Sequence, residues 1–307
     1  MNIDDFINAK KEYKNGKNIT EYLKNATNTD YNTSQIIEFA YDLQAGSYIE
    51  AYNKNFTSLN LYIKELATII EKNIESTNSI LDIGTGELTT LSGIIQNINI
   101  RPKKIYAFDI SFSRIHKGLQ FIKNIQNNKC LDLIPFVSDI KQIPLLTKSI
   151  NITISSHALE PNGSNLRELI IELFRITTDK LILFEPCYEV NTEEGKKRMD
   201  KLGYIKNIDG IIKDLNGEIL EKIIIKNVIN ILNPTVCFII KPPITNEKHN
   251  LEKDNIFSIP GTNYSVIKNE NYYFSKETGF CYPIIKEIPI LRNTNYILTS
   301  SLEDFEE

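Results

Sequence analysis

A pair of glycines between an apolar run and an amphipathic stretch constrains this chain more than any other feature of its sequence. Gly84 and Gly86 follow the apolar run SILDI, and Leu91, Ile95 and Ile98 recur at helical spacing after them. Glycine adopts positive φ and lets a ligand approach the backbone closely. The N-terminus of the next helix offers free N–H groups to such a ligand. The segment therefore predicts a strand, a tight turn and a helix, with either a ligand or a plain turn at the glycines.

Short apolar runs keep alternating with amphipathic stretches as far as Pro186. Further strands are predicted at KIYAFDI, LIPFVSDI, INITISSH and KLILFEP, and helices at SRIHKGLQFIKNI and LRELIIELFRI. Strands that alternate with helices favour a mostly parallel sheet with helices on both faces. The later segments EKIIIKNVINI and TVCFIIKP can pair as an antiparallel hairpin at the edge of that sheet.

The chain on either side of this region has a different pattern. Residues 1–75 are expected to form a helical cover, because apolar residues recur at three- and four-residue spacing in SLNLYIKELATIIEKN. The α/β domain is expected over residues 76–245, and the polar stretch that begins at Thr245 indicates a linker. Residues 246–307 hold short strands and turns, which predict a small β-rich appendage.

Composition limits the partners of the chain. With 41% hydrophobic residues among 307, the chain can bury a large core. Its 35 basic and 39 acidic side chains give a net charge of -4, which disfavours nucleic acid as a partner. Four scattered cysteines and three histidines predict neither a disulfide framework nor a metal site. We therefore expect a cytoplasmic protein that does not enter a membrane, with a small-molecule substrate and with a homo-oligomer left open.

Acidic residues at the ends of the next two strands narrow the choice of ligand. Asp109 ends a strand 25 residues after Gly84, where a carboxylate can accept both hydroxyls of a ribose. Asp139 ends the following strand and can receive the exocyclic amine of an adenine. A dinucleotide would need a third glycine at Thr89, and Asp82 adds negative charge where a pyrophosphate would lie. Asp82 suits a ligand that carries an amino group instead. A ligand with an amine, a ribose and an adenine but no phosphate is S-adenosylmethionine, so these residues disfavour NAD.

The order of these motifs resembles that of class I S-adenosylmethionine-dependent methyltransferases of the small-molecule type. ILDIGTGE is similar to the first motif of the family, AFDIS to the second, FVSDIKQIPL to the third and INITISSHALEP to the fourth. The hairpin over 221–241 fits the antiparallel last strand of that family. The resemblance therefore implies a Rossmann-like α/β fold with a seven-stranded, mostly parallel sheet.

The same resemblance implies which residues bind the cofactor. YDLQAGSYIEAY is similar to a Y-D-x-x-A-x-x-Y segment that covers the cofactor in small-molecule members, although its tyrosines can instead pack against the sheet. The residues carried over for cofactor binding are Tyr41, Tyr48, Asp82, Gly84, Gly86, Asp109, Ile110, Asp139, Ile140 and Ser155. Among them, Asp82 and the two glycines are expected at the methionine portion, Asp109 at the ribose, and Asp139 with Ile140 at the adenine.

The end of the chain carries a second resemblance. GFCYPIIKEIPIL is similar to the Y-P-I-x-x-G-I-P-x-L end of small Trm112-like zinc-ribbon domains. Glu287 replaces the glycine of that pattern, and Cys281 is the only cysteine nearby. The resemblance therefore implies a metal-free, structural segment, and leaves open a role in binding a partner or covering a substrate.

Methyl transfer to a hydroxyl or amine needs a group that takes the proton of the acceptor. His157 follows the fourth strand of the motif order and is the candidate base, with a loop-anchoring role as the alternative. Glu185 ends the next strand and either orients His157 or caps a turn. Glu160, Tyr188 and Glu189 are expected at the substrate.

The sequence thus predicts methyl transfer from S-adenosylmethionine to a small polar acceptor, with a hydroxyl of a sugar or other metabolite favoured over an amine. One alternative is a methyltransferase that acts on a protein, peptide or RNA. Another is a non-catalytic scaffold subunit that binds the cofactor. An NAD-dependent oxidoreductase is the least favoured alternative.

Overall fold

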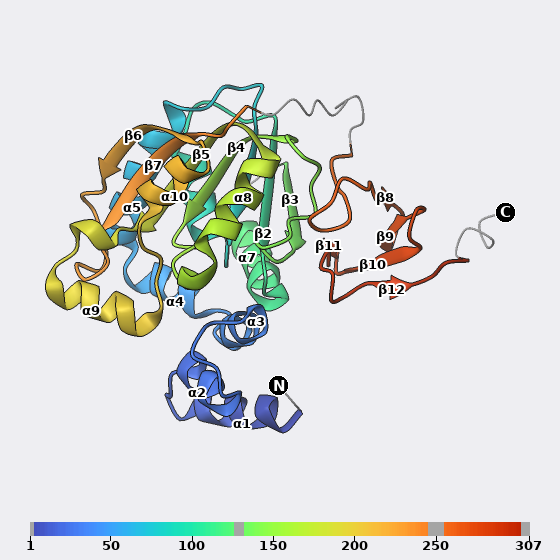
Figure 1. Cartoon of the computed structure of the whole chain (residues 1–307), viewed down its shortest axis with the longest axis horizontal. Coiled ribbons are helices and arrows are strands. Elements are labelled where there is room, and N and C mark those ends of the chain that lie inside the picture. Colours follow the sequence, from blue (N-terminus) through green and yellow to red (C-terminus); the bar gives the residue numbers. More distant parts are fainter. Residues whose placement is uncertain (1–2, 126–131, 245–254, 302–307) are drawn as a thin grey trace.

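The computed structural model describes residues 3–125, 132–244 and 255–301. A seven-stranded sheet lies at its centre, with the strand order β3-β2-β1-β4-β5-β7-β6 (Figure 1). Strands β1 to β5 run parallel, and β7 is antiparallel to both β5 and β6. The strands are β1 (Ser79–Ile83), β2 (Lys104–Asp109), β3 (Leu133–Val137), β4 (Ile150–Ser156), β5 (Thr177–Pro186), β6 (Glu218–Ile224) and β7 (Thr235–Lys241). The mostly parallel sheet predicted from the sequence is therefore confirmed.

Helices cover both faces of this sheet, because successive side chains of each strand point to opposite sides. On β1, Leu81 packs in a cluster with α8, and the adjacent Ile80 packs in a second cluster with α5 and α6. The helices around the sheet are α5 (Phe56–Glu71), α6 (Thr89–Asn97), α7 (Phe112–Ile125), α8 (Leu166–Ile176), α9 (Glu193–Leu202) and α10 (Ile208–Asp214). Two short 3-10 turns, η1 (Gly163–Asn165) and η2 (Tyr188–Val190), precede α8 and α9.

Four helices of the described residues precede α5, the helix that contains the apolar spacing of SLNLYIKELATIIEKN. They are α1 (Ile3–Lys14), α2 (Ile19–Ala26), α3 (Ser34–Leu43) and α4 (Ser47–Lys54). The first three pack around their own small core, and α3 lies between the other two and the rest of the molecule (Figure 1). The break between α3 and α4 falls at Gly46, which has φ 106°, a conformation that glycine adopts without strain.

The C-terminal segment, residues 255–301, is an antiparallel β structure beside β3 (Figure 1). Its strands are β8 (Ile267–Lys268), β9 (Tyr272–Ser275), β10 (Phe280–Ile285), β11 (Ile288–Pro289) and β12 (Ile297–Leu298). Phe257 and Tyr282 of this segment belong to the same buried cluster as Leu81 of β1. The segment therefore shares the core of the central sheet. The linker expected from Thr245, together with Cys130 and His249, lies outside the described residues.

Within the described part of the chain, every helix is too short or too polar to cross a membrane.

Phe136 tests whether the C-terminal segment shares one core with the sheet. Its fully buried ring lies 5.2 Å from that of Phe108 on β2 and 5.3 Å from that of Phe257. We expect Phe136→Ala to lower the free energy of unfolding by about 3–5 kcal/mol in urea titrations. Phe56→Ala, at a ring that is 50% exposed, should lower it by less than about 1 kcal/mol. Equal losses in the two variants would contradict the shared core.

Candidate functional site

A cavity of about 120 Å³ lies at the carboxyl ends of β1, β2, β3 and β4, beneath α3 and α4. Ligands of open α/β sheets bind at this edge, where the strand order reverses between β1 and β4. Nine of the fifteen residues singled out from the sequence line the cavity: Tyr41, Tyr48, Gly84, Asp109, Ile110, Asp139, Ile140, His157 and Glu160. The other six, which are Asp82, Gly86, Ser155, Glu185, Tyr188 and Glu189, lie outside its lining.

The turn after β1 leaves no room for a side chain at its glycine positions. Gly84 has φ 60°, and a Cβ added there would lie 2.4 Å from the Cβ of Ala158. Beneath it, the Thr85 hydroxyl donates a 2.6 Å hydrogen bond to the Asp82 carboxylate. Burial raises the pKa of Asp82 to about 7, although the Thr85 hydrogen bond acts in the opposite direction. Asp82 therefore supports the turn from inside the protein and does not face the cavity.

The Asp109 carboxylate joins the glycine turn to the start of α7. Its Oδ2 accepts a hydrogen bond of 2.9 Å from the Gly86 N–H, and its Oδ1 accepts one of 2.9 Å from the Ser111 N–H. A carboxylate offers about four lone-pair positions, so each oxygen can accept a further hydrogen bond from a ligand. The carboxylate is thus fixed in place and still able to bind hydroxyl groups in the cavity.

Arg114 is a charged cavity residue that the sequence did not single out. Its guanidinium lies between the rings of Tyr41 and Tyr48, 5.0 and 4.5 Å from their centroids, and 3.6 Å from the Asp109 Oδ2. It also explains Gly86, because a Cβ there would lie 2.3 Å from Arg114 Nη2. The one sequence feature that could have placed Arg114 near the cavity is its position five residues after Asp109, in the first turn of α7. The two tyrosines therefore pack on a cation in this structure.

A second missed residue, Glu87, ties the helical cover to the glycine turn. Its carboxylate is buried and accepts hydrogen bonds of 2.8 Å from the N–H groups of Gly46 and Ile49. These N–H groups lie at the start of α4, where a negative charge also interacts favourably with the helix dipole. The Glu87 carboxylate therefore connects the helical cover to the turn that follows β1.

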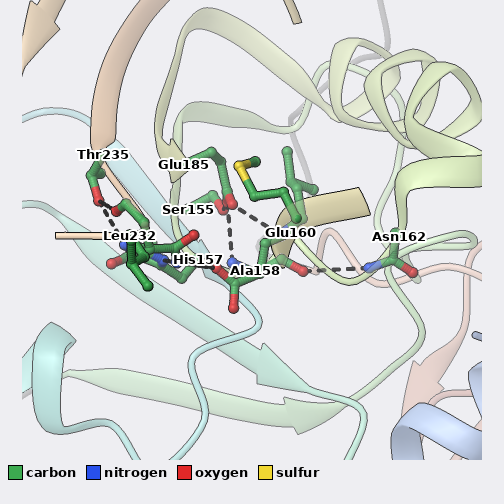
Figure 2. Close-up of polar contacts among 12 residues, drawn as sticks. Ser155, His157, Ala158, Glu160, Asn162, Glu185, Leu232 and Thr235 are labelled. Atoms are coloured by element: carbon green, nitrogen blue, oxygen red, sulfur yellow. Dashed lines mark hydrogen bonds and ion pairs between the residues drawn. The ribbon is translucent and has the colours of Figure 1, made fainter. Parts of the chain in front are cut away.

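His157 lies directly after β4, at the wall of the cavity (Figure 2). Its Nδ1 is 2.9 Å from Glu160 Oε2 and its Nε2 is 3.0 Å from Thr235 Oγ1. Burial lowers the pKa of His157, but the nearby carboxylates of Glu160 and Glu185 raise it further, so that the result is a pKa above its ordinary value. The side chain keeps 30% exposure, which leaves it accessible to a ligand.

Glu185 is fully buried at the end of β5 and holds the loop that carries His157 (Figure 2). Its Oε1 accepts hydrogen bonds from the Ser155 hydroxyl and, at 3.1 Å each, from the N–H groups of Ala158 and Leu159. Its Oε2 has no hydrogen-bond partner among the described residues. Burial raises the pKa of Glu185 to about 7. The sequence had placed Ser155 at the cofactor, but in the structure its hydroxyl points to Glu185.

Tyr188 and Glu189 lie on η2, away from the cavity. The Tyr188 hydroxyl donates to Asp200 at 3.3 Å, and Glu189 is exposed and accepts a 2.8 Å hydrogen bond from the Asn207 N–H. Of the three residues expected at the substrate, only Glu160 lines the cavity.

Comparison with known proteins identifies the fold. No family model and no curated protein sequence matches the chain. Among solved structures, the magnesium protoporphyrin IX methyltransferase of Synechocystis, with bound SAH, is 12% identical, with a TM-score of 0.52 over 69% of this chain and 100% of that one. A chain from the complex between the Haloferax volcanii Trm112 methyltransferase activator and a putative methyltransferase is 13% identical, with a TM-score of 0.51 over 66% of this chain and 97% of that one. The chain therefore has the Rossmann-like fold of class I methyltransferases.

Glu185 makes stability depend on pH. Between its ordinary pKa of 4.5 and about 7, the unfolded chain releases a proton that the folded protein keeps. This carboxyl therefore destabilises the folded protein as the pH rises through that window. Glutamine does not ionise, so the unfolding free energy of Glu185→Gln relative to wild type should rise by on the order of 2–3 kcal/mol between pH 4.5 and 8, at about 1.4 kcal/mol per pKa unit. A difference that stays constant with pH would contradict the buried, protonated carboxyl.

Proposed function

We propose that this chain is a methyltransferase that uses S-adenosylmethionine and acts on a small polar acceptor, with a hydroxyl favoured over an amine. The observation that carries the proposal is that Gly84, Asp109 and His157 line the same cavity. Its position at the carboxyl ends of the parallel strands is where this class of sheet binds ligands. The likeness in fold to solved methyltransferases supports the same assignment.

The donor groups of the cavity fit S-adenosylmethionine. Asp109 has lone pairs for the two ribose hydroxyls, and Gly84, which has no side chain, lines the cavity with its backbone. Asp139 and Ile140 would lie at the adenine, with a carboxylate for its exocyclic amine and an apolar side chain for its ring. When bound, the cofactor supplies a methyl group on a positively charged sulfur.

His157 would take the proton of the acceptor. With the Nδ1–H donated to Glu160, Nε2 carries the lone pair and faces the Thr235 hydroxyl. That hydroxyl has a second acceptor in the Asn233 carbonyl, 3.4 Å away, so it can turn from Nε2. As the acceptor oxygen bonds to the methyl carbon, the methyl–sulfur bond breaks, its electrons remain on sulfur, and the hydroxyl proton moves to Nε2. Glu160 stabilises the imidazolium that results.

Two features favour a small acceptor. The helices α3 and α4 cover the cavity, which limits access for a folded macromolecule. The net charge of -4 does not attract a nucleic acid backbone. The C-terminal segment is proposed to be a structural part of the enzyme without a metal, because the paired cysteines of Trm112-like domains are missing from it. The proposed compartment is the cytoplasm.

Asp109 should decide cofactor affinity. We expect wild-type protein to bind S-adenosylmethionine and S-adenosylhomocysteine, but not NAD, in calorimetric titrations. Asp109→Ala removes two hydrogen bonds to an ionised group, worth about 1.5–3 kcal/mol each, and should weaken binding by about 10²- to 10⁴-fold. Asp132→Ala, at an exposed aspartate before β3, is the matched control and should bind as wild type does. Binding of NAD alone would support the oxidoreductase alternative, and full affinity in Asp109→Ala would remove Asp109 from the site.

His157 should affect turnover and leave cofactor binding unchanged. In assays that follow S-adenosylhomocysteine release over a panel of hydroxylated metabolites, loss of the base in His157→Ala should slow turnover by about 10²- to 10⁴-fold. Activity should rise with pH as His157 loses its proton. Because Glu160 raises the pKa of His157, Glu160→Gln should move that rise to lower pH. Full turnover in His157→Ala would assign the residue to the loop instead, and activity only on protein, peptide or RNA would overturn the small acceptor.

A further inference from the structure

The C-terminal segment, residues 255–301, extends the central sheet at a point next to the cavity. Ile290 forms a parallel bridge with Val137, the last residue of β3, and the Leu291 N–H donates a 2.9 Å hydrogen bond to the Val137 carbonyl. Ser138 and Asp139, which follow directly, line the cavity. The backbone that enters this wall of the cavity is therefore held by the C-terminal segment.

An apolar contact joins the same segment to α7. Ile288 of β11 is fully buried and clusters with Val137 and with Ile115 of α7. Ile115 directly follows Arg114, whose guanidinium lies inside the cavity. Burying side chains of this size stabilises the contact by about 1.5–3 kcal/mol each. The C-terminal segment thus packs behind two walls of the cavity.

An ion pair joins the segment to the helical cover. Arg292 Nη1 lies 2.5 Å from the Glu38 Oε1 of α3, and the arginine side chain is only 8% exposed. Glu38 lies between Ile37 and Tyr41, which both line the cavity. Four residues later, on the same side of the helix, Asp42 accepts hydrogen bonds from the Ser111 and Ser113 hydroxyls, at 2.7 and 3.0 Å. Two carboxylates therefore fix α3 in place: Glu38 binds the C-terminal segment, and Asp42 binds the start of α7.

We propose that the C-terminal segment completes the cofactor site within the chain, and that Arg292 is a positioning residue that holds α3 over the cavity through Glu38. The inference rests on the proposed function, since the ligand in question is the cofactor. It assigns a role in binding to residues 255–301, although none of these residues lines the cavity.

Glu38 and Arg292 differ in burial, so replacing one of them should cost more than replacing the other. Glu38 keeps 36% exposure, so water can solvate its carboxylate when Arg292 is replaced. Arg292 is buried, and its Nε has no hydrogen-bond partner among the described residues, so loss of Glu38 leaves a buried cation without its anion. Removing one partner of a buried pair is the more costly change when the remaining charge is the buried one. We therefore expect Glu38→Gln to disturb the cover more than Arg292→Met.

A double-mutant cycle on the full chain tests this coupling, with S-adenosylhomocysteine as the titrated ligand. Each of Glu38→Gln and Arg292→Met should weaken binding by about fivefold or more, as coupled sites typically do. The double variant should bind within about twofold of Arg292→Met, because it lacks the same ion pair and no longer leaves a buried cation without its anion. Hydrogen exchange without ligand should show faster exchange of the amides of α3 in each variant, while those of α5 keep the wild-type rate.

The exposed pair Arg167–Asp214, with 3.8 Å between Nη1 and Oδ2, provides the control cycle. Arg167→Met and Asp214→Asn should leave ligand affinity unchanged. Affinities equal to wild type in Glu38→Gln and Arg292→Met, or losses that add in the double variant, would overturn the inference while leaving the proposed function intact. Absence of binding in the wild-type protein would instead contradict the proposed function. In that case, unchanged hydrogen exchange of the α3 amides in the variants would by itself refute the positioning role of Arg292.

Discussion

The contacts of the Asp109 carboxylate determine the arrangement of the whole site. It binds the backbone of the glycine turn and of the first residues of α7, and it pairs with Arg114, on which Tyr41 and Tyr48 of the cover pack. Together with Glu87, this buried anion connects the sheet to the helices above it. Arg114 lies near the carboxylates of both Asp109 and Glu87, and its loss would leave two buried anions without a cation.

The walls of the cavity differ in how they are held. The first turn and the start of α7 are fixed by hydrogen bonds to Asp109, whereas the loop after β4 is fixed from beneath by Glu185. Glu185 accepts the N–H groups of Ala158 and Leu159 with one oxygen, directly after His157, whose backbone has the left-handed conformation at φ 58°. Burial raises the pKa of both Asp82 and Glu185 to about 7, so acids near the site are partly neutral under ordinary conditions.

The sequence predicted the sheet and the strand ends well, because apolar periodicity and glycine turns are local signals. Gly84, Asp109 and His157 lie together as the strand order requires. Side-chain contacts between distant segments could not be predicted in the same way. Arg114 was read as part of an ordinary helix, and the pair between Glu38 and Arg292 joins residues that no local pattern connects. Glu185 and Ser155 stood at the right strand ends, but which way a side chain turns there depends on its neighbours.

The measurement that tests the central claim most directly is a crystal structure of the full chain grown with S-adenosylhomocysteine. The account predicts the ligand in the cavity beneath α3 and α4, with both ribose hydroxyls within hydrogen-bonding distance of the Asp109 carboxylate and the adenine beside Ile140. Density for the ligand elsewhere, or an Asp109 carboxylate paired only with Arg114 at saturating ligand, would contradict it.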